Sequence, residues 1–241
     1  MSLAVSELFR PHHAELRQRL IRCCLVVLLA SAVAYLFRDQ LAAWCIRPLQ
    51  QAYPPLEKLV YTKLTDAFLS YLKLSFLVGL MVSFPFILHQ AWLFVAPGLH
   101  DREKRTVLIV VFWASLLFLG GCLFAFFIVL PWLLHYFMSY AGPSLQPMLK
   151  LGLYLTFIAR MVLTFGIAFQ IPFLMVMAVR TGLVGPDYFR KNRLMFAIVI
   201  GVLAFLLSAG DLTATVLLSF PLLGLYESGL VVARVLHRPS R

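Results

Sequence analysis

The chain is divided into long apolar stretches that alternate with short polar segments. The six apolar stretches cover residues 20–37, 74–95, 106–138, 151–179, 194–207 and 212–233. Apolar and polar residues do not alternate singly within them, as they would in the strands of a membrane barrel. Because a membrane helix needs about 20 predominantly apolar residues, the pattern predicts an all-α, polytopic membrane protein. Its six transmembrane helices would form a single domain, residues 1–241.

Two of the predicted helices have unusual lengths. A helix over all of 106–138 would be about 50 Å long, which exceeds a hydrocarbon core of roughly 30 Å. We expect it to tilt, kink or protrude. The stretch 194–207 gives only about 21 Å, so we expect the bilayer to thin, or water to enter, near the turn that follows it.

Proline lies inside four of the predicted helices, at Pro85, Pro131, Pro172 and Pro221. Each proline removes one intrahelical hydrogen bond and bends its helix. We therefore predict bent helices that form a concave wall. The alternative is that proline is simply frequent in membrane helices. The long polar segment Arg38–Lys73 has room for one or two short amphipathic helices.

Composition supports a membrane protein and excludes several other classes. Hydrophobic residues make up 62% of the chain and charged residues 13%, against about 25% charged in a soluble domain. A soluble enzyme, a disordered chain and a disulfide-stapled secreted domain are therefore excluded. The four cysteines show no metal-binding spacing, and we interpret those in apolar stretches as small hydrophobic residues.

The positive charge indicates how the helices are oriented. The net charge is +11, which in a soluble protein would suggest nucleic-acid binding. Here 14 of the 21 Lys and Arg residues lie in the two terminal segments and in the second and fourth loops, and six lie in the loops on the other side. The positive-inside rule then places both termini in the cytoplasm, and no nucleic-acid partner is expected.

The N-terminal segment has a second interpretation. Arg17, Arg19 and Arg22 precede an apolar stretch in which Ala30–Ala34 supplies two A-x-A patterns. This order resembles a secretory signal peptide. Cleavage would leave five helices, and the charge pattern fits six better.

The sequence contains no pattern that predicts catalysis. The nucleophile-elbow, zinc-protease and P-loop motifs are missing. His12, His13 and Glu15 are close in sequence, but adjacent histidines point to different sides of a helix, which does not suit a metal. We expect no enzyme activity, no cofactor and no metal.

Two acids lie at the cytoplasmic edge of predicted helices. Glu15 and Glu103 could each accept the two parallel hydrogen bonds of an arginine side chain. The alternative is local pairing, in which Glu15 binds Arg19 one helical turn away and Glu103 binds the basic residues beside it.

Three polar residues fall within or between the last three apolar stretches. Gln170 either faces a partner or water, or makes one hydrogen bond that holds two helices together. Asp211 either has a role of its own or caps the last helix. Arg160 lies nearer the outer end of its helix, where it can pair or reach the surface, and we assign it no role.

Several segments together resemble one family. His12–Arg19 is similar to the H-x-x-E-L-R-x-R start of the TatC family, the multispanning core of the twin-arginine protein translocase. Phe84–Leu99 with Glu103–Arg105 resembles the family's second helix and second cytoplasmic loop. Phe165–Pro172 resembles its fourth helix, and Pro221–Glu227 its P-x-x-x-L-Y-E ending. Each motif is weak alone, but the four occur in order along nearly the whole chain.

The resemblance implies a function. TatC-like proteins sit in the bacterial cytoplasmic membrane, recognise the paired arginines of signal peptides on folded export substrates, and work with the single-span proteins TatA and TatB. They form homo- and hetero-oligomers, and transport is driven by the proton-motive force. The resemblance therefore implies a signal-peptide receptor and translocase scaffold in the lipid bilayer.

The resemblance also assigns residues to this function. The positions that match the family's signal-peptide patch are Glu15, Glu103, Arg17, Arg19, Phe94 and Leu99. The positions that match partner or translocation sites are Pro48, Phe68, Gln170 and Asp211. One departure affects the last of these, because the family turn T-P-P-D is Ser208–Asp211 here, and Thr215 replaces a family glutamine.

A small-solute or ion carrier is the alternative function. It would use Gln170 and Arg160 in a wet cavity. Carriers place ionisable residues deep within several helices, whereas most acids of this chain lie at helix edges, and this favours the receptor.

Overall fold

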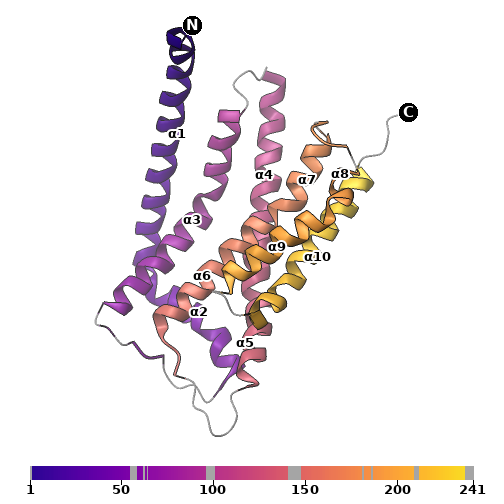
Figure 1. Cartoon of the computed structure of the whole chain (residues 1–241). Coiled ribbons are helices and arrows are strands. Elements are labelled where there is room, and N and C mark those ends of the chain that lie inside the picture. Colours follow the sequence, from indigo (N-terminus) through magenta and orange to yellow (C-terminus); the bar gives the residue numbers. More distant parts are fainter. Residues whose placement is uncertain are drawn as a thin grey trace.

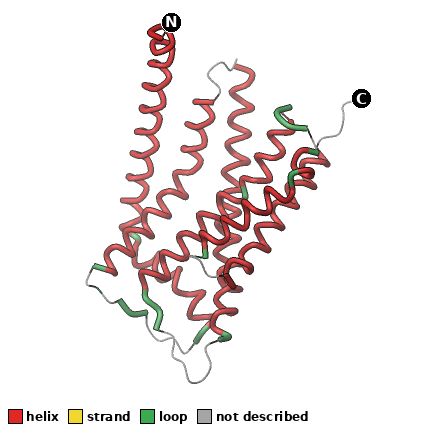
Figure 2. Tube along the Cα trace, viewed as in Figure 1, coloured by secondary structure: helices red, strands yellow, loops and turns green. Residues whose placement is uncertain are grey.

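In the computed structural model, the chain forms helices joined by turns and loops (Figure 1). The structure describes residues 2–54, 59–61, 63, 65–95, 101–140, 148–180, 182–185, 187–208 and 212–236. Within these ranges, side chains are described except at 2–14, 94–95, 101–107 and 235–236. Over this part of the chain no strand is present (Figure 2) and the only extended pairing is one isolated bridge, which confirms the all-α class.

Most of the helices follow one another with few intervening residues, and the longest connections join α2 to α3 and α5 to α6. Their bounds are α1 Ser2–Leu36, α2 Arg38–Ala52, α3 Asp66–Val95, α4 Asp101–Phe124, α5 Leu130–Met138, α6 Leu151–Ala168, α7 Gln170–Arg180, α8 Tyr188–Lys191, α9 Arg193–Leu207 and α10 Leu212–Leu236, with a π-helix, η1, at Ala125–Val129. α4, η1 and α5 form one continuous rod, and α7 continues α6 after a single residue.

Five segments of the described chain are long and apolar enough to cross a membrane. They are Glu15–Leu36, Asp66–Leu93, Leu108–Met138, Leu151–Arg180 and Leu212–Arg234. The apolar helix α9 has only 15 residues, in line with the short fifth stretch of the sequence. Five long segments and one short helix agree with the predicted six-helix membrane protein.

The two ends of the bundle carry different elements. One end, which we call the terminal end, holds the start of α1, the end of α3, the start of α4, α8 and the end of α10 (Figure 1). The opposite end holds α2, α5 and the start of α6 (Figure 1). α1 stands upright in this view, whereas α6, α9 and α10 run obliquely, so the helices do not form a straight bundle.

Proline sets the two irregular points of the helices. In the rod α4–η1–α5, the backbone N–H of Leu130 donates to the carbonyl of Ala125, five residues earlier. This wider turn lies directly before Pro131, where an ordinary helix would lose a hydrogen bond. Pro172 acts similarly, because its ring disfavours a helical carbonyl at Ala168, and α6 ends there. The expected interruptions at these two prolines are therefore present.

The other two prolines lie within unbroken helices. Pro85 is inside α3 and Pro221 inside α10. α3 curves along its length (Figure 1), as expected for a helix in which proline removes one backbone hydrogen bond.

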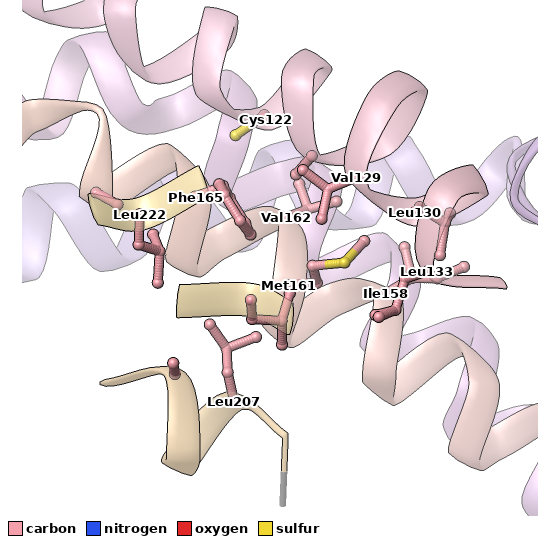
Figure 3. Close-up of a cluster of buried hydrophobic side chains, with 14 of the residues drawn as sticks. Cys122, Val129, Leu130, Leu133, Ile158, Met161, Val162, Phe165, Leu207 and Leu222 are labelled. Carbon is pink, nitrogen blue, oxygen red and sulfur yellow. The ribbon is translucent and has the colours of Figure 1, made fainter. Parts of the chain in front are cut away.

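The core lies between the rod α4–η1–α5 and α6. Figure 3 shows Cys122, Val129, Leu130 and Leu133 of the rod facing side chains of α6. From α6, Met161 and Phe165 are fully buried. The labelled residues that complete the cluster are Ile158 and Val162 of α6, Leu207 of α9 and Leu222 of α10. The short helix α9 is thus held by packing on α6 and α10.

Glycines let two helix pairs approach closely. A Cβ on Gly121 of α4 would lie 2.6 Å from the carbonyl oxygen of Phe165 on α6. A Cβ on Gly79 of α3 would lie 2.2 Å from the Oγ of Ser31 on α1. Small residues are the usual means of bringing membrane helices into contact, and here they fix α4 on α6 and α3 on α1.

Contacts distant in sequence tie the opposite end together. α2 starts after a one-residue turn at Phe37 and is a short helix of the kind expected in the first long loop. The hydroxyl of Tyr154 in α6 donates to the carbonyl of Cys45 in α2, at 2.8 Å. Val60 forms a parallel bridge with Lys150. At this end, therefore, α2 is bonded to α6 and the segment around Val60 is bonded to the start of α6.

Candidate functional site

The residues predicted to bind a signal peptide come from three helix ends at the terminal end of the bundle. Glu15, Arg17 and Arg19 lie on α1, Phe94 is next to the last residue of α3, and Glu103 is the third residue of α4. The start of α1, the end of α3 and the start of α4 share this end (Figure 1). α3 packs against both α1 and α4, so it is the element that joins the two predicted acidic positions.

Glu15 and Arg19 form an ion pair one helical turn apart. The Nε and Nη2 atoms of Arg19 both donate to Oε1 of Glu15, at 3.0 and 2.5 Å. The spacing of four residues puts the two side chains on one face of α1. The local pairing that the sequence left open as an alternative for Glu15 is therefore present.

Arg19 also connects α1 to α3. Its Nη1 donates to Oε1 of Gln90 at 3.1 Å, across 71 positions of sequence. Gln90 is buried, so its amide oxygen gains a charged partner that it needs. The guanidinium of Arg19 is thus held from two sides, by Glu15 and by Gln90.

Glu15 keeps accessible hydrogen-bonding capacity. Its side chain is 42% exposed, against 19% for Arg19. Among the described residues, no donor binds its second oxygen, Oε2. A carboxylate offers about four lone-pair positions. Glu15 can therefore accept a further cationic donor while Arg19 stays bound.

The remaining predicted patch residues are described less fully. Arg17 is exposed on α1. The backbones of Phe94 and Glu103 belong to α3 and α4, but their side chains lie outside the described part. Leu99 lies outside it entirely. The role of Glu103 in binding a signal arginine, and those of Phe94 and Leu99 beside it, therefore stay predictions.

Gln170 makes the interhelical hydrogen bond that was one of its two interpretations. It is the first residue of α7, directly after the break at Phe169. Its Nε2 donates to the backbone carbonyl of Ala114 on α4 at 2.9 Å. The amide therefore links α7 to α4 where the proline interrupts the helix.

Pro48 belongs to α2 and Phe68 to the start of α3, and both of these elements lie at the opposite end (Figure 1). Pro48 is buried within α2. Phe68 of α3 is 55% exposed and meets the ring of Tyr35 edge-on. Asp211 lies outside the described residues. The hydroxyl of Ser208, three positions earlier in the sequence, shares a 2.7 Å hydrogen bond with the hydroxyl of Thr215.

The structure adds a polar cluster that sequence reasoning did not assign. Arg193 at the start of α9 pairs with Glu227 of α10. The hydroxyl of Tyr226 donates to the carbonyl of Phe189 in α8 at 2.6 Å. A charged residue inside an apolar stretch, as Glu227 is, was the available signal. In the described structure the family-like ending L-Y-E therefore fastens α10 to α8 and α9.

Metal and thiol chemistry have little support in the described part of the chain. No group of three His, Cys, Asp or Glu side chains lies close enough there to hold a metal ion. Burial raises the pKa of the Cys45 thiol in α2 to about 11, which keeps it protonated at neutral pH. Cys45 lies outside the apolar stretches, but its burial gives it the character of a small hydrophobic residue.

Comparisons with known proteins agree with the arrangement. The family model described as "Sec-independent protein translocase protein (TatC)" matches residues 11–221. The Sec-independent protein translocase protein TatC of Desulforapulum autotrophicum is 34% identical over 227 residues, which is 94% of this chain and 84% of that protein. The TatC protein of Aquifex aeolicus is 33% identical over 235 residues, 95% of this chain and 96% of that one.

A solved structure has the same fold. The crystal structure described as the twin arginine translocase receptor TatC superimposes with a TM-score of 0.84 and 31% identity. The match covers 94% of this chain and all of that one. The likeness extends over the helices that carry the candidate site at the terminal end. The chain therefore belongs to the TatC family of the Sec-independent protein translocase.

Proposed function

We propose that this TatC-family chain is the signal-peptide receptor and core subunit of a twin-arginine translocase, and that Glu15 and Glu103 bind the signal arginines. The observation that carries the proposal is the state of Glu15. Its carboxylate is fixed on α1 by Arg19 and, through Arg19, by Gln90 of α3, yet it remains exposed with one oxygen unoccupied among the described residues.

Carboxylates in such a setting suit arginine in particular. A guanidinium donates two parallel hydrogen bonds to a carboxylate, whereas lysine offers a point charge on a flexible stem. A carboxylate held in place loses less side-chain entropy when it binds. A signal peptide with two adjacent arginines would thus be distinguished from one with two lysines.

Arg19 would act as a positioning residue for the receptor carboxylate. Because Gln90 accepts from Arg19 Nη1, Arg19 keeps a partner when a signal arginine shares Glu15. Without Gln90, the Arg19 guanidinium would depend on Glu15 alone. Binding of the peptide would then compete more directly with the internal ion pair.

The proposal includes orientation and partners. The excess of Lys and Arg in the terminal segments and the second and fourth loops supports a terminal end that faces the cytoplasm of a bacterial-type inner membrane. A signal peptide emerging on a folded substrate would reach the patch from that side. TatA- and TatB-like single-span proteins and further copies of the chain are the proposed partners, with transport driven by the proton-motive force.

Site-specific crosslinking tests the receptor function. An Arg-Arg signal peptide and a Lys-Lys control would carry the same photoreactive group, in membranes that contain the full chain. The receptor variants are Glu15→Gln and Glu103→Gln. The matched control is Glu227→Gln, because Glu227 is also an exposed glutamate paired with an arginine.

The expected result is selective loss of binding. Hydrogen bonds to charged groups contribute about 1.5–3 kcal/mol, so each receptor variant should weaken binding by roughly tenfold or more. The Lys-Lys peptide should crosslink weakly to every form, and Glu227→Gln should resemble the unchanged chain. Equal crosslinking of all forms by both peptides would refute the assignment of Glu15 and Glu103.

The carrier function is not favoured. It required Gln170 to face a wet cavity, and its amide instead donates to the backbone carbonyl of Ala114. The family comparisons also point to protein translocation.

A further inference from the structure

A deep groove lies away from the signal-peptide patch, between α1, α3 and α6. Its volume is about 730 Å³. α3 packs against both α1 and α6 and so forms the floor, while α1 and α6 form the walls. Leu28 of α1 and Leu163 of α6 line the two walls, and Leu72 and Phe76 of α3 line the floor. The groove is apolar along most of its length.

Two cations line this apolar groove. Lys73 extends from α3 and Arg160 from α6. Among the described residues, no acidic side chain lines the groove and neither cation takes part in an ion pair. Arg160 is the charge that the sequence left without a role. An unpaired cation within a membrane helix needs an anionic partner or water.

The depth of the two cations suits a lipid headgroup. Arg160 lies about 14 Å along α6 from Leu151, and Lys73 about 10 Å along α3 from Asp66. Both helices start at the opposite end of the bundle (Figure 1). Long basic side chains at such positions extend toward the headgroup level while their stems pack on apolar surface. Tyr35 also lines the groove, and the guanidinium of Arg38 lies 4.9 Å from the centre of its ring. Tyrosine side chains are enriched at the membrane interface.

The hydroxyl groups of the groove favour an acyl chain over an extended peptide as its occupant. Ser31 and Thr156 each donate to a carbonyl of their own helix, at 2.7 Å, so they offer no free donor to a peptide backbone. Ser75 is buried on α3, and its hydroxyl has no partner among the described residues. An extended peptide would leave most of its backbone groups unpaired in this groove, whereas an acyl chain has none to satisfy. The arginine pair of a signal peptide would also be repelled by Lys73 and Arg160.

We propose that the groove binds one anionic phospholipid from the leaflet at the opposite end of the bundle. Lys73 and Arg160 hold its phosphate, and one acyl chain lies along the apolar surface between α1 and α6. The lipid joins α1 to α6 across α3. Basic pockets between membrane helices are known to select anionic headgroups in this way.

Native mass spectrometry of the full chain tests the proposal. The detergent-purified protein is offered equimolar phosphatidylglycerol and phosphatidylcholine with identical acyl chains. Two cations predict a preference of roughly tenfold or more for phosphatidylglycerol. The double variant Lys73→Gln with Arg160→Gln should bind both lipids about equally. The matched control is Lys63→Gln with Lys150→Gln, which removes two exposed charges outside the groove and should keep the preference.

A second variant separates a built site from general charge attraction. Ala159→Phe fills the groove from α6 and keeps both cations, so it should also reduce retention of phosphatidylglycerol. Circular dichroism and gel filtration would establish that each variant is folded. The proposal is overturned if the double variant keeps its preference, or if a folded Ala159→Phe binds phosphatidylglycerol as the unchanged chain does. It is also overturned if the chain binds the two lipids equally and the apolar segment of a signal peptide binds in the groove instead.

Discussion

Gln170 occupies the point where α6 ends and α7 begins, and its amide donates to the carbonyl of Ala114 on α4. We predict that Gln170→Leu lowers the free energy of unfolding by about 0.6–1.5 kcal/mol, the contribution of one such hydrogen bond. The loss is modest because the Ala114 carbonyl lies within α4 and keeps its helical partner. Thermal unfolding in detergent, followed by circular dichroism, measures the change.

The control for this prediction is a glutamine without such a bond. Gln40→Leu changes an exposed glutamine of α2 and should leave the unfolding midpoint nearly unchanged. If Gln170→Leu were as stable as the unchanged chain but abolished export, the hydrogen bond to Ala114 would not be the main role of Gln170. A translocation role for the amide would then have to replace it.

The candidate site could be predicted from sequence only where its partners are near in sequence. Glu15 and Arg19 are four residues apart, so helical geometry alone brings them together. Gln90 is equally visible as a polar residue in an apolar stretch, but its contact with Arg19 spans 71 positions and depends on how α1 crosses α3. The groove cation Arg160 had no sequence partner at all, because its setting is made by three helices.

Gly79 sets the distance between α1 and α3, the two helices that share the Arg19 contact. A Cβ there would lie 2.2 Å from Ser31 Oγ and 2.6 Å from the Ser31 backbone nitrogen. Because backbone atoms cannot move aside as a side chain can, Gly79→Ala must separate the helices. We predict a loss of about 1–3 kcal/mol in the free energy of unfolding, as for an overpacked core. The unfolding midpoint in detergent measures it.

A second glycine supplies the matched control. Gly201 lies inside α9, and a Cβ there would meet nothing within 4 Å. Gly201→Ala should be neutral or stabilising by about 0.5–1 kcal/mol, since alanine favours a helix. Equal midpoints for the two variants would show that α1 and α3 are free to move apart at Gly79, contrary to the tight packing described above.

The elements themselves were largely readable from the apolar pattern. Each long apolar stretch is helical over nearly its whole length, with irregular points in 106–138 and 151–179, because backbone groups in a bilayer must be paired within their own segment. Helix ends were not readable in the same way. α1 begins at Ser2 and α3 at Asp66, well before their apolar stretches, since polar residues continue a helix equally well outside the hydrocarbon. The prolines predicted irregularities, but the choice of a π-helix at Pro131 and a break at Pro172 depended on the surrounding packing.

The molecule as a whole places the proposed signal-peptide site and the proposed lipid site at different positions along the bundle. Charged and polar groups at the terminal end face a compartment from which a signal peptide arrives in our proposal. The opposite end carries α2 and the bridge between Val60 and Lys150. The groove with Lys73 and Arg160 receives a lipid in our second proposal. The receptor proposal requires that the terminal end faces the cytoplasm. The orientation of the chain in the membrane is therefore the most informative test at the scale of the whole molecule.

Cysteine labelling in cells determines that orientation. With the four native cysteines replaced by alanine, Lys191→Cys adds one thiol in α8 at the terminal end, and Lys63→Cys adds one in the segment before α3; both positions are exposed. Fourteen of the 21 Lys and Arg residues lie in the segments of the terminal end, and the positive-inside rule places that end in the cytoplasm. A membrane-impermeant maleimide should therefore label Lys63→Cys in intact cells and Lys191→Cys only after lysis. The reverse pattern would put the Glu15 patch outside the cell, where no signal peptide awaits export, and would refute the receptor proposal together with the orientation.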